Sequence, residues 1–280
     1  MKELRTSIAV CLLALGTATL AQNEDDALRY SITMPGGTAR AWGLAGAMGA
    51  VGADPAAATI NPAGFGLYNT SEFSLTLGLE SNTAKAAFYS TAASASRQRM
   101  SVNNLGLVFS YRKNNSDWRG GTFGVSYDRQ ASFQRKELAS ADRVPGTFRD
   151  QFVLEANGIP YTDLENGGLP FTAGLAWYTY GIDTMPGSTD QYLPGIPSGS
   201  DTRQQHTIDA SGRMGTTSLF YATNYKDKLY IGFGLGLTGT RYERYTTHDE
   251  RVLDENADMR TVRYKEDLLT TGNGLNVKLG

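Results

Sequence analysis

The chain has 280 residues, a formal net charge of -2 and a mean hydropathy of -0.33. The near balance of charge argues against a nucleic-acid-binding protein, which shows a concentrated basic surface, and nothing after the N-terminus offers the about 18 consecutive apolar residues of a membrane-spanning helix. The single cysteine lies in an N-terminal apolar run, so the sequence after that run excludes disulfides, cysteine metal sites and cysteine nucleophiles.

Residues 1–21 have the layout of a secretory signal peptide. Two basic residues, Lys2 and Arg5, precede the apolar run Ile8–Leu15, and small residues lead up to Ala21. This order predicts cleavage after Ala21 and export without a membrane helix.

Residues 22–70 are expected to form a segment distinct from the strands that follow. Glycine and alanine dominate between Ala27 and Leu67, so the segment has too few large side chains for a core of its own. A segment of this kind suits passage close to the walls of a barrel. Asp54 and the proline after it predict an N-cap and the first position of a short helix, which ends near Asn61 because the next residue is again proline.

Period-two alternation of apolar with small or polar residues is the strongest pattern in the chain. The clearest case begins at Leu229 and ends at Leu237, with glycine at three of the intervening positions. Because successive side chains of a strand point to opposite faces, one face is apolar and the other has almost no side chains. A transmembrane antiparallel β-barrel has this pattern, and so does a soluble β-sandwich. The alternating segments are 73–79, 105–111, 123–127, 229–237 and 275–279.

The lengths of the connections favour the barrel over residues 71–280. Short polar turns are expected at Lys113–Trp118, near Lys226 and at Thr271–Asn273, whereas the connections at about 133–213 and after Thr240 are long. Short turns at one end of the strands and long loops at the other are typical of an outer-membrane barrel, whose short turns face the periplasm.

The long extracellular loop expected at about 133–213 contains one apolar stretch, Leu169–Ile182. Between the short turns near residues 115 and 226 the chain must cross the membrane an even number of times, and segments 121–132 and 214–224 supply two crossings. The apolar stretch is therefore assigned to the loop, where its spacing fits a helix. A helix folded over the barrel mouth would offer ligand-binding residues, and simple packing within the loop is the alternative. The candidate ligand-binding residues are Phe171, Leu175, Trp177 and Tyr178.

Three other patterns are interpreted as structural. The glycine run at 232–236 lies within a strand, whereas a phosphate-binding loop needs a strand before it and a helix after it. His206 and His248 fall in expected outer loops without a nucleophile beside them, so no catalytic residue, enzyme activity, metal or cofactor is expected. A solvated charged loop, with calcium or lipopolysaccharide contact as the alternative, is expected for Asp249, Glu250, Asp254, Glu255 and Asp258.

Seven strands can be counted, and the last still alternates at Gly280. Bacterial single-chain barrels have even strand numbers, and an open sheet edge in lipid leaves unpaired backbone groups. We therefore expect the sequence to be part of a longer barrel, with a barrel assembled from several chains as the alternative.

Short motifs before the first strand are the most specific feature of residues 27–80. They are Gly37-Thr38-Ala39-Arg40, Gly43-Leu44-Ala45-Gly46-Ala47, Asp54, Asn61-Pro62-Ala63-Gly64 and Ser71-Glu72-Phe73-Ser74. In this order, between a signal peptide and a barrel, they resemble the N-terminal hatch of the FadL/TodX family, the outer-membrane transporters of long-chain fatty acids and hydrocarbons.

The resemblance implies a fourteen-stranded barrel, about half of it present here, whose lumen is blocked by an N-terminal plug. Hydrophobic substrates would enter from outside, bind in an apolar pocket and leave after the plug shifts, in some members through a lateral opening. Asn61, Pro62, Ala63 and Gly64 would form the gating turn of the plug, and a mere helix cap is the alternative. A monomer in outer-membrane lipid and lipopolysaccharide is implied, inserted by the barrel-assembly machinery and without a nucleic-acid partner.

Two functions are therefore expected for the protein. One is passive, gated transport of hydrophobic small molecules such as long-chain fatty acids or aromatic hydrocarbons, and the other is a structural or adhesive barrel whose plug never moves. A continuous apolar path from residues 169–182 to the plug would favour transport, whereas a polar or sealed interior would favour the structural barrel.

Overall fold

A computed structural model describes residues 24–32, 36–165, 171–197, 199–255, 257 and 259–280. The expected signal peptide lies outside these residues. The chain divides into residues 1–34 and residues 35–280. The described part of the first unit contains α2 (Glu24–Ser31), whose first turn is acidic and so complements the helix dipole. No helix among the described residues is long and apolar enough to span a membrane.

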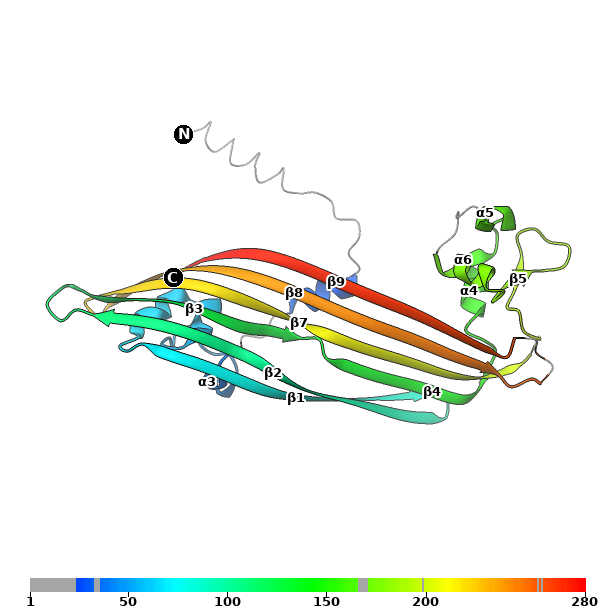
Figure 1. The fold of residues 1–280 in the computed structure, drawn as a ribbon, viewed down its shortest axis with the longest axis horizontal. Coiled ribbons are helices and arrows are strands. Elements are labelled where there is room, and N and C mark those ends of the chain that lie inside the picture. The colour runs from blue at the N-terminus through cyan, green and yellow to red at the C-terminus, as the bar shows by residue number, and fades with distance from the viewer. Residues whose placement is uncertain (1–23, 33–35, 166–170, 198, 256, 258) are drawn as a thin grey trace, which may run out of the picture. The chain divides into compact units, whose positions relative to one another are not determined.

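One antiparallel sheet of seven strands dominates the second unit (Figure 1). Its neighbours follow the order β1-β2-β3-β7-β8-β9, and β4 pairs with part of β7. The expected antiparallel β fold is therefore confirmed. Across the described residues β1 and β9 end the strand order, β4 pairs with β7 alone, and the sheet is not closed into a barrel. The strands are β1 (Glu72–Phe88), β2 (Thr91–Arg112), β3 (Trp118–Ser132), β4 (Arg135–Pro145), β7 (Asp201–Tyr225), β8 (Leu229–Val252) and β9 (Thr261–Leu279), with a separate pair β5 (Asp183–Thr184) and β6 (Tyr192–Leu193).

Short helices precede the sheet and fill the long connection between β4 and β7. The helix expected after Asp54 is confirmed as a single 3-10 turn, and the helix expected within residues 169–182 is confirmed as α6. A second 3-10 turn, η2, begins at the proline where the first helix was expected to end. The helices are α3 (Ala39–Gly43), η1 (Pro55–Thr59), η2 (Pro62–Leu67), α4 (Asp150–Ala156), α5 (Tyr161–Glu165) and α6 (Phe171–Tyr178).

Two of the three expected short turns are present. Residues 113–117 join β2 to β3, and the turn between β7 and β8 has positive φ at Lys226 and Asp227, as a type I′ hairpin turn requires. The turn expected at Thr271–Asn273 is wrong, because these residues lie within β9. A further short turn at residues 89–90 joins β1 to β2 at the opposite end of the sheet, so short turns are not confined to one end.

The strands extend beyond their apolar segments, which corrects both expected long loops. The connection placed at about 133–213 covers only 146–200, because β4 pairs with the first part of β7. The loop expected after Thr240 is shorter still, since β8 continues to residue 252 and β9 begins at residue 261. Opposite charges on the two paired strands, as in the Arg244–Glu266 ion pair, stabilise this polar extension, which a search for apolar alternation cannot detect.

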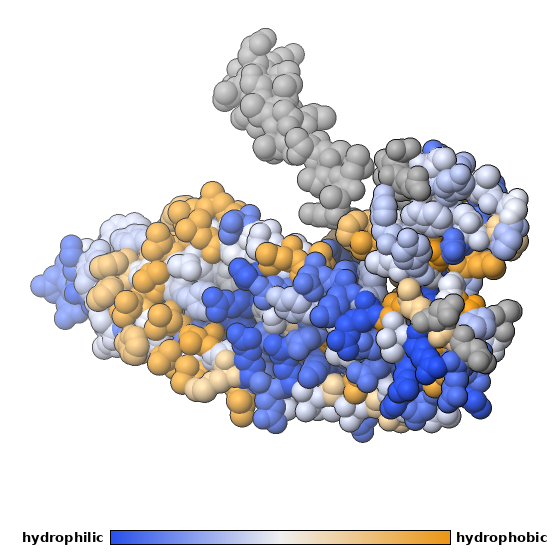
Figure 2. All heavy atoms as spheres, turned by 45° about the vertical axis from the view of Figure 1, so that its right-hand side comes forward, coloured by the Kyte–Doolittle hydropathy of each residue, from blue (hydrophilic) through white to orange (hydrophobic). Residues whose placement is uncertain are grey.

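The two faces of the sheet differ in character. Residues 36–68 pack against one face, which we call the covered face, and we call the opposite face the bare face. Most large apolar side chains on the bare face are exposed, with fractions from 42% for Leu107 to 81% for Leu279, while Val125 and Leu235 are half-buried. Figure 2 shows hydrophobic side chains gathered toward the end of the sheet with the β2–β3 and β7–β8 turns. One rung of paired residues on the bare face is Phe73, Leu107, Val125, Leu219, Leu235 and Val277.

Candidate functional site

Two consecutive capped turns organise the N-terminal segment, residues 36–68. The Asp54 carboxylate accepts from the backbone N–H of Ala56 at 2.9 Å, and the Asn61 side-chain oxygen accepts from that of Ala63 at 3.1 Å. Proline at the first position of each turn has no N–H to satisfy and fixes φ. The repeated pattern of cap and proline therefore sets the local path of the chain.

Polar contacts join these turns to the rest of the segment. The Thr38 hydroxyl donates to the Asp54 carboxylate at 2.8 Å, while the Asn61 amide donates to the Gly49 carbonyl at 3.0 Å. Asp54 and Thr38 are both buried. Since a buried polar group without a partner is costly, these bonds specify one arrangement of the segment.

An aromatic contact anchors the segment to the covered face. Phe65 of η2 is fully buried, and its ring stacks on Phe220 of β7 with 3.5 Å between centroids. Val108 of β2 and Ala222 of β7 belong to the same buried cluster, as does Tyr68. This small core is the main apolar contact between the segment and the sheet.

Glycines on the covered face allow the segment to approach the strands. A Cβ on Gly106 would lie 2.9 Å from the Pro55 side chain, and a Cβ on Gly232 would overlap the backbone of Pro62 and Ala63. Glycine at these places admits a close backbone approach. The face that the alternation predicts to carry glycine and other small residues is thus the covered face, on which residues 36–68 lie.

A buried polar cluster lies beside the segment on the covered face. The Asn104 amide of β2 donates to the Asp128 carboxylate of β3 at 2.8 Å, and the Ser126 hydroxyl donates to the same carboxylate at 2.9 Å. All three residues are buried. Gly37 of the segment packs directly against Asp128. The cluster links β2 and β3 under the first residues of the segment.

The four predicted gating residues lie together at the segment's contact with β8. Asn61 caps η2, Pro62 packs toward Gly232 and Gly234 of β8, and Ala63 is buried. The Gly64 carbonyl accepts from the Ala53 N–H at 2.9 Å. Asn61 is therefore a helix cap in this structure, the alternative weighed for it from the sequence.

The four candidate ligand-binding residues lie on α6 but do not form a common pocket. Phe171 is 79% exposed and Tyr178 60%, and Leu175 lies on the same exposed side of the helix. Trp177 instead packs in a small core of the 146–200 connection, with Tyr192 and Tyr161 beside it. Packing within the loop, the alternative weighed for these residues, accounts for Trp177.

A buried ion pair fastens this connection to the covered face. The side chains of Arg149 and Glu250 are fully buried, with 3.3 Å between Nε and Oε1. Glu250 also accepts from the Thr147 hydroxyl at 2.6 Å and from the Phe148 N–H at 2.9 Å. The expectation of a solvated charged loop is wrong for Glu250 and for Asp249, because both belong to β8.

The two histidines face each other across β7 and β8, so their expected position in loops is also wrong. His206 and His248 are register partners, and their Nδ1 atoms are 3.3 Å apart. Phe148 packs on the His248 ring with 4.3 Å between centroids. Burial, together with His206, lowers the pKa of His248 to about 4, which favours the neutral imidazole. Among the described residues, no group of three or more metal-ligating side chains is found.

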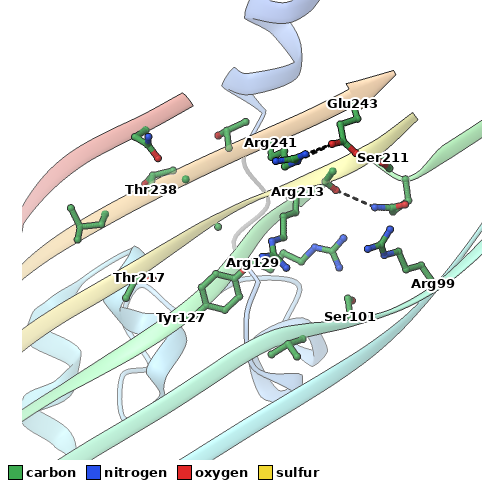
Figure 3. Close-up of a pocket in the computed structure, with 18 of the residues that line it drawn as sticks. Arg99, Ser101, Tyr127, Arg129, Ser211, Arg213, Thr217, Thr238, Arg241 and Glu243 are labelled. Carbon is green, nitrogen blue, oxygen red and sulfur yellow. Dashed lines mark hydrogen bonds and ion pairs between the residues drawn. The ribbon is translucent and has the colours of Figure 1, made fainter. Parts of the chain in front are cut away.

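A cavity of about 1000 Å³ lies between β2 and strands β3, β7 and β8 (Figure 3), and residues from both sides of the strands line it. Arg99, Arg129 and Arg213 converge on it. Arg129 also pairs with Glu80 of β1 at 2.7 Å. The cavity lies where β2 parts from β3, since their pairing stops at Asn104 while both strands continue.

Sequence reasoning missed this cluster of arginines, although a signal was present. On β8 the bare-face positions run from Leu237 through Gly239 to Arg241, and on β7 they run from Thr217 to Arg213. Counting every second residue beyond the apolar run would have placed these arginines on the same face. Comparison of the chain with family models, with curated proteins and with solved structures finds no match.

Proposed function

We propose that the chain forms part of a bacterial outer-membrane β-barrel and that residues 36–68 are its plug. The observation that carries this proposal is the direction of the apolar side chains. They cross six neighbouring strands in register on the bare face, and most of them are exposed, with Val125 and Leu235 half-buried. An exposed apolar surface of this extent is typical of contact with lipid or with a partner.

The height of the apolar surface fits a bilayer. From Leu229 to Leu237 a strand rises about 27 Å, and a tilt of about 40° reduces this to about 21 Å. Outer-membrane barrels carry an apolar band about 25 Å tall. Beyond this band the bare-face positions of β7 and β8 become polar, as expected outside the membrane.

The opposite faces also distinguish the barrel from a soluble β-sandwich. A sandwich buries its apolar side chains between two sheets and exposes the polar ones. Here the rung next to the apolar one is small and polar, and residues 36–68 lie on that side. This polar rung consists of Ser74, Gly106, Ser126, Ser218, Gly236 and Asn276.

Within this barrel we assign passive, gated transport of hydrophobic small molecules such as long-chain fatty acids or aromatic hydrocarbons. The support is the resemblance of the plug motifs to the FadL/TodX hatch together with the dense contact of Asn61–Gly64 with β8. Short-range contacts and one small apolar core hold the plug against the sheet. The plug therefore closes the barrel while these contacts are made and is released when they break.

One observation favours the structural barrel instead. The side chains of Phe171, Leu175 and Tyr178 are exposed, so within the described residues α6 does not begin an apolar path toward the plug. A barrel whose plug never moves would need no such path. The two functions therefore differ in whether the plug must move.

A reversible disulfide between plug and sheet tests the requirement for movement. A Cβ built on Gly234 lies 3.6 Å from the Cβ of Pro62, within the about 3.5–4.5 Å of natural disulfides. The double variant Pro62→Cys, Gly234→Cys can therefore be locked by oxidation and released by a reductant. The native Cys11 lies in the expected signal peptide. The two single-cysteine variants are the controls.

The measurement is uptake of a labelled long-chain fatty acid by cells producing the full protein, with surface abundance matched. Gated transport predicts uptake in the reduced double variant, loss on oxidation and no effect of oxidation on either single variant. Equal uptake in the locked and reduced forms would contradict gating by the plug. Protein-independent uptake of both fatty acids and aromatic hydrocarbons would favour the structural barrel.

A further inference from the structure

The two histidines of the sequence form a pair where the 146–200 connection meets the sheet. His206 of β7 and His248 of β8 are register partners, and their Nδ1 atoms are 3.3 Å apart. Phe148, near the start of the connection, packs on the His248 ring. The proposed plug and the proposed transport make no use of this pair, so another role can be sought for it.

The separation of the two Nδ1 atoms matches that of two ligands of one zinc ion. Zinc binds imidazole nitrogen at about 2.0–2.1 Å in tetrahedral geometry, which places any two ligand atoms about 3.3–3.4 Å apart. A square-planar ion with bonds of this length would place neighbouring ligands about 2.8–3.0 Å apart. A direct hydrogen bond between the rings would be a long one, because N–H donors usually lie about 2.7–3.2 Å from their acceptors.

The rings are in the state that a metal ion requires. Ligation needs a neutral imidazole, and burial together with His206 lowers the pKa of His248. The Nε2 atom of His248 is buried without a hydrogen-bond partner among the described residues, so this ring makes its polar contact through Nδ1. Both histidines are only half-buried, and solvent can therefore reach them.

The carboxylates next to the pair already have partners. Glu250 accepts from the Thr147 hydroxyl and pairs with Arg149, while Asp249 pairs with Arg263. An ion at the histidines would thus have two protein ligands and complete its coordination with water. Structural zinc sites have four protein ligands, so this ion would exchange with the solvent.

We propose that His206 and His248 bind one exchangeable Zn²⁺ ion through their Nδ1 atoms, with water completing a tetrahedral site. The ion joins β7 to β8 and fixes the His248 ring against Phe148. Bound zinc therefore strengthens the attachment of the 146–200 connection to the sheet. This site does not depend on the proposed membrane position or on transport.

The test measures zinc binding by the full protein, purified without a histidine tag and stripped of metal with a chelator. Zn²⁺ is titrated by calorimetry against the unchanged protein and against His206→Gln and His248→Gln, each of which leaves one imidazole. Thr247→Gln is the matched control, because Thr247 precedes His248 in β8 and so lies on the opposite face. Mg²⁺, which prefers oxygen ligands, is titrated to detect unspecific attraction of cations.

One Zn²⁺ should bind the unchanged protein and the control with equal affinity. Each histidine variant should bind it about tenfold or more weakly, since loss of a group that merely orients a metal ligand already costs about 10–100-fold. Because a bound ion stabilises the folded state, zinc should slow proteolysis within residues 150–165 of the unchanged protein and of neither histidine variant. Equal zinc affinity in all four proteins, or Mg²⁺ binding as tight as that of Zn²⁺, would overturn the proposal.

X-ray absorption at the zinc edge tests the unchanged protein by itself, so the proposal can be refuted even if a histidine variant fails to fold. The expected spectrum shows two imidazole nitrogens and two oxygens around the ion. A spectrum with oxygen ligands alone, or a protein that retains no zinc at saturating concentration, would overturn the site.

Discussion

Gly232 of β8 lies so close to Pro62 of η2 that any Cβ at this position would overlap the proline backbone. We therefore predict that Gly232→Ala displaces residues 36–68 from the sheet. Overpacking of this kind costs about 1–3 kcal/mol, which should appear as earlier denaturant unfolding and faster proteolysis of the segment. Gly272→Ala on β9 is the matched control, because nothing lies within 4 Å of a Cβ there. Equal losses in the two variants would contradict the close approach.

Substitutions of Asn61 separate two contributions to the stability of the segment, one from the side-chain oxygen that caps η2 and one from the side-chain amide. Its oxygen accepts from the Ala63 N–H and its amide donates to the Gly49 carbonyl. Asn61→Ala loses both and should cost about 0.5–2 kcal/mol. Asn61→Asp keeps the cap acceptor and loses the donor, so it should retain part of this stability in denaturant unfolding. An Asp variant as unstable as the Ala variant would show that the cap contributes little.

The buried Arg149–Glu250 pair should hold the 146–200 connection on the sheet. Glu250→Gln leaves the guanidinium buried without its counter-charge, a change that costs about 3–5 kcal/mol. Limited proteolysis within residues 150–165 should become much faster. The exposed pair Arg203–Asp142 provides the control, since Arg203→Ala should change proteolysis little. Protection unchanged by Glu250→Gln would refute the anchoring role.

Acidification should weaken the same connection through His248. This residue lies on β8 well beyond the apolar band, facing His206 and packed against Phe148, with Asp249 next to it in the chain. Its pKa is about 4 in the folded protein, below the ordinary 6.5. The unfolded chain therefore binds more protons between these values, and stability should fall as the pH drops from 6.5 toward 4.

His248→Gln is the variant that isolates this effect. It should flatten the pH dependence of denaturant unfolding between pH 6.5 and pH 4, because it removes the group that must be protonated. If the variant lost stability on acidification as steeply as the unchanged protein, other groups would be responsible.

The alternation of apolar with small residues is the pattern from which most of the predicted strands were inferred. Leu229–Leu237 indicated both a strand and its two faces, because the period of a strand is two and the contrast between leucine and glycine is large. The same rule missed residues 241–252 of β8, where most side chains on both faces are polar and where strand pairing together with ion pairs such as Arg244–Glu266 maintains the strand. Thr271–Asn273 was assigned to a turn for the same reason, although it continues a strand.

The contacts of the candidate site were less accessible to sequence reasoning. Asp54 and its proline identified a capped turn, because the cap is local. The stacking of Phe65 on Phe220 and the Arg149–Glu250 pair join residues far apart in the chain. Neither pair has a local pattern, so only the fold brings them together.

The most direct test of the account concerns Val277 and Lys278, neighbours on β9 that occupy opposite faces. Spin labels attached to Val277→Cys and, separately, to Lys278→Cys report which reagents reach each face when the full protein is in a bilayer. Contact of the bare face with lipid predicts that dissolved oxygen relaxes the label at 277 more than a water-soluble nickel chelate does, with the order reversed at 278. Equal access of the nickel chelate to both labels would contradict a lipid-facing bare surface.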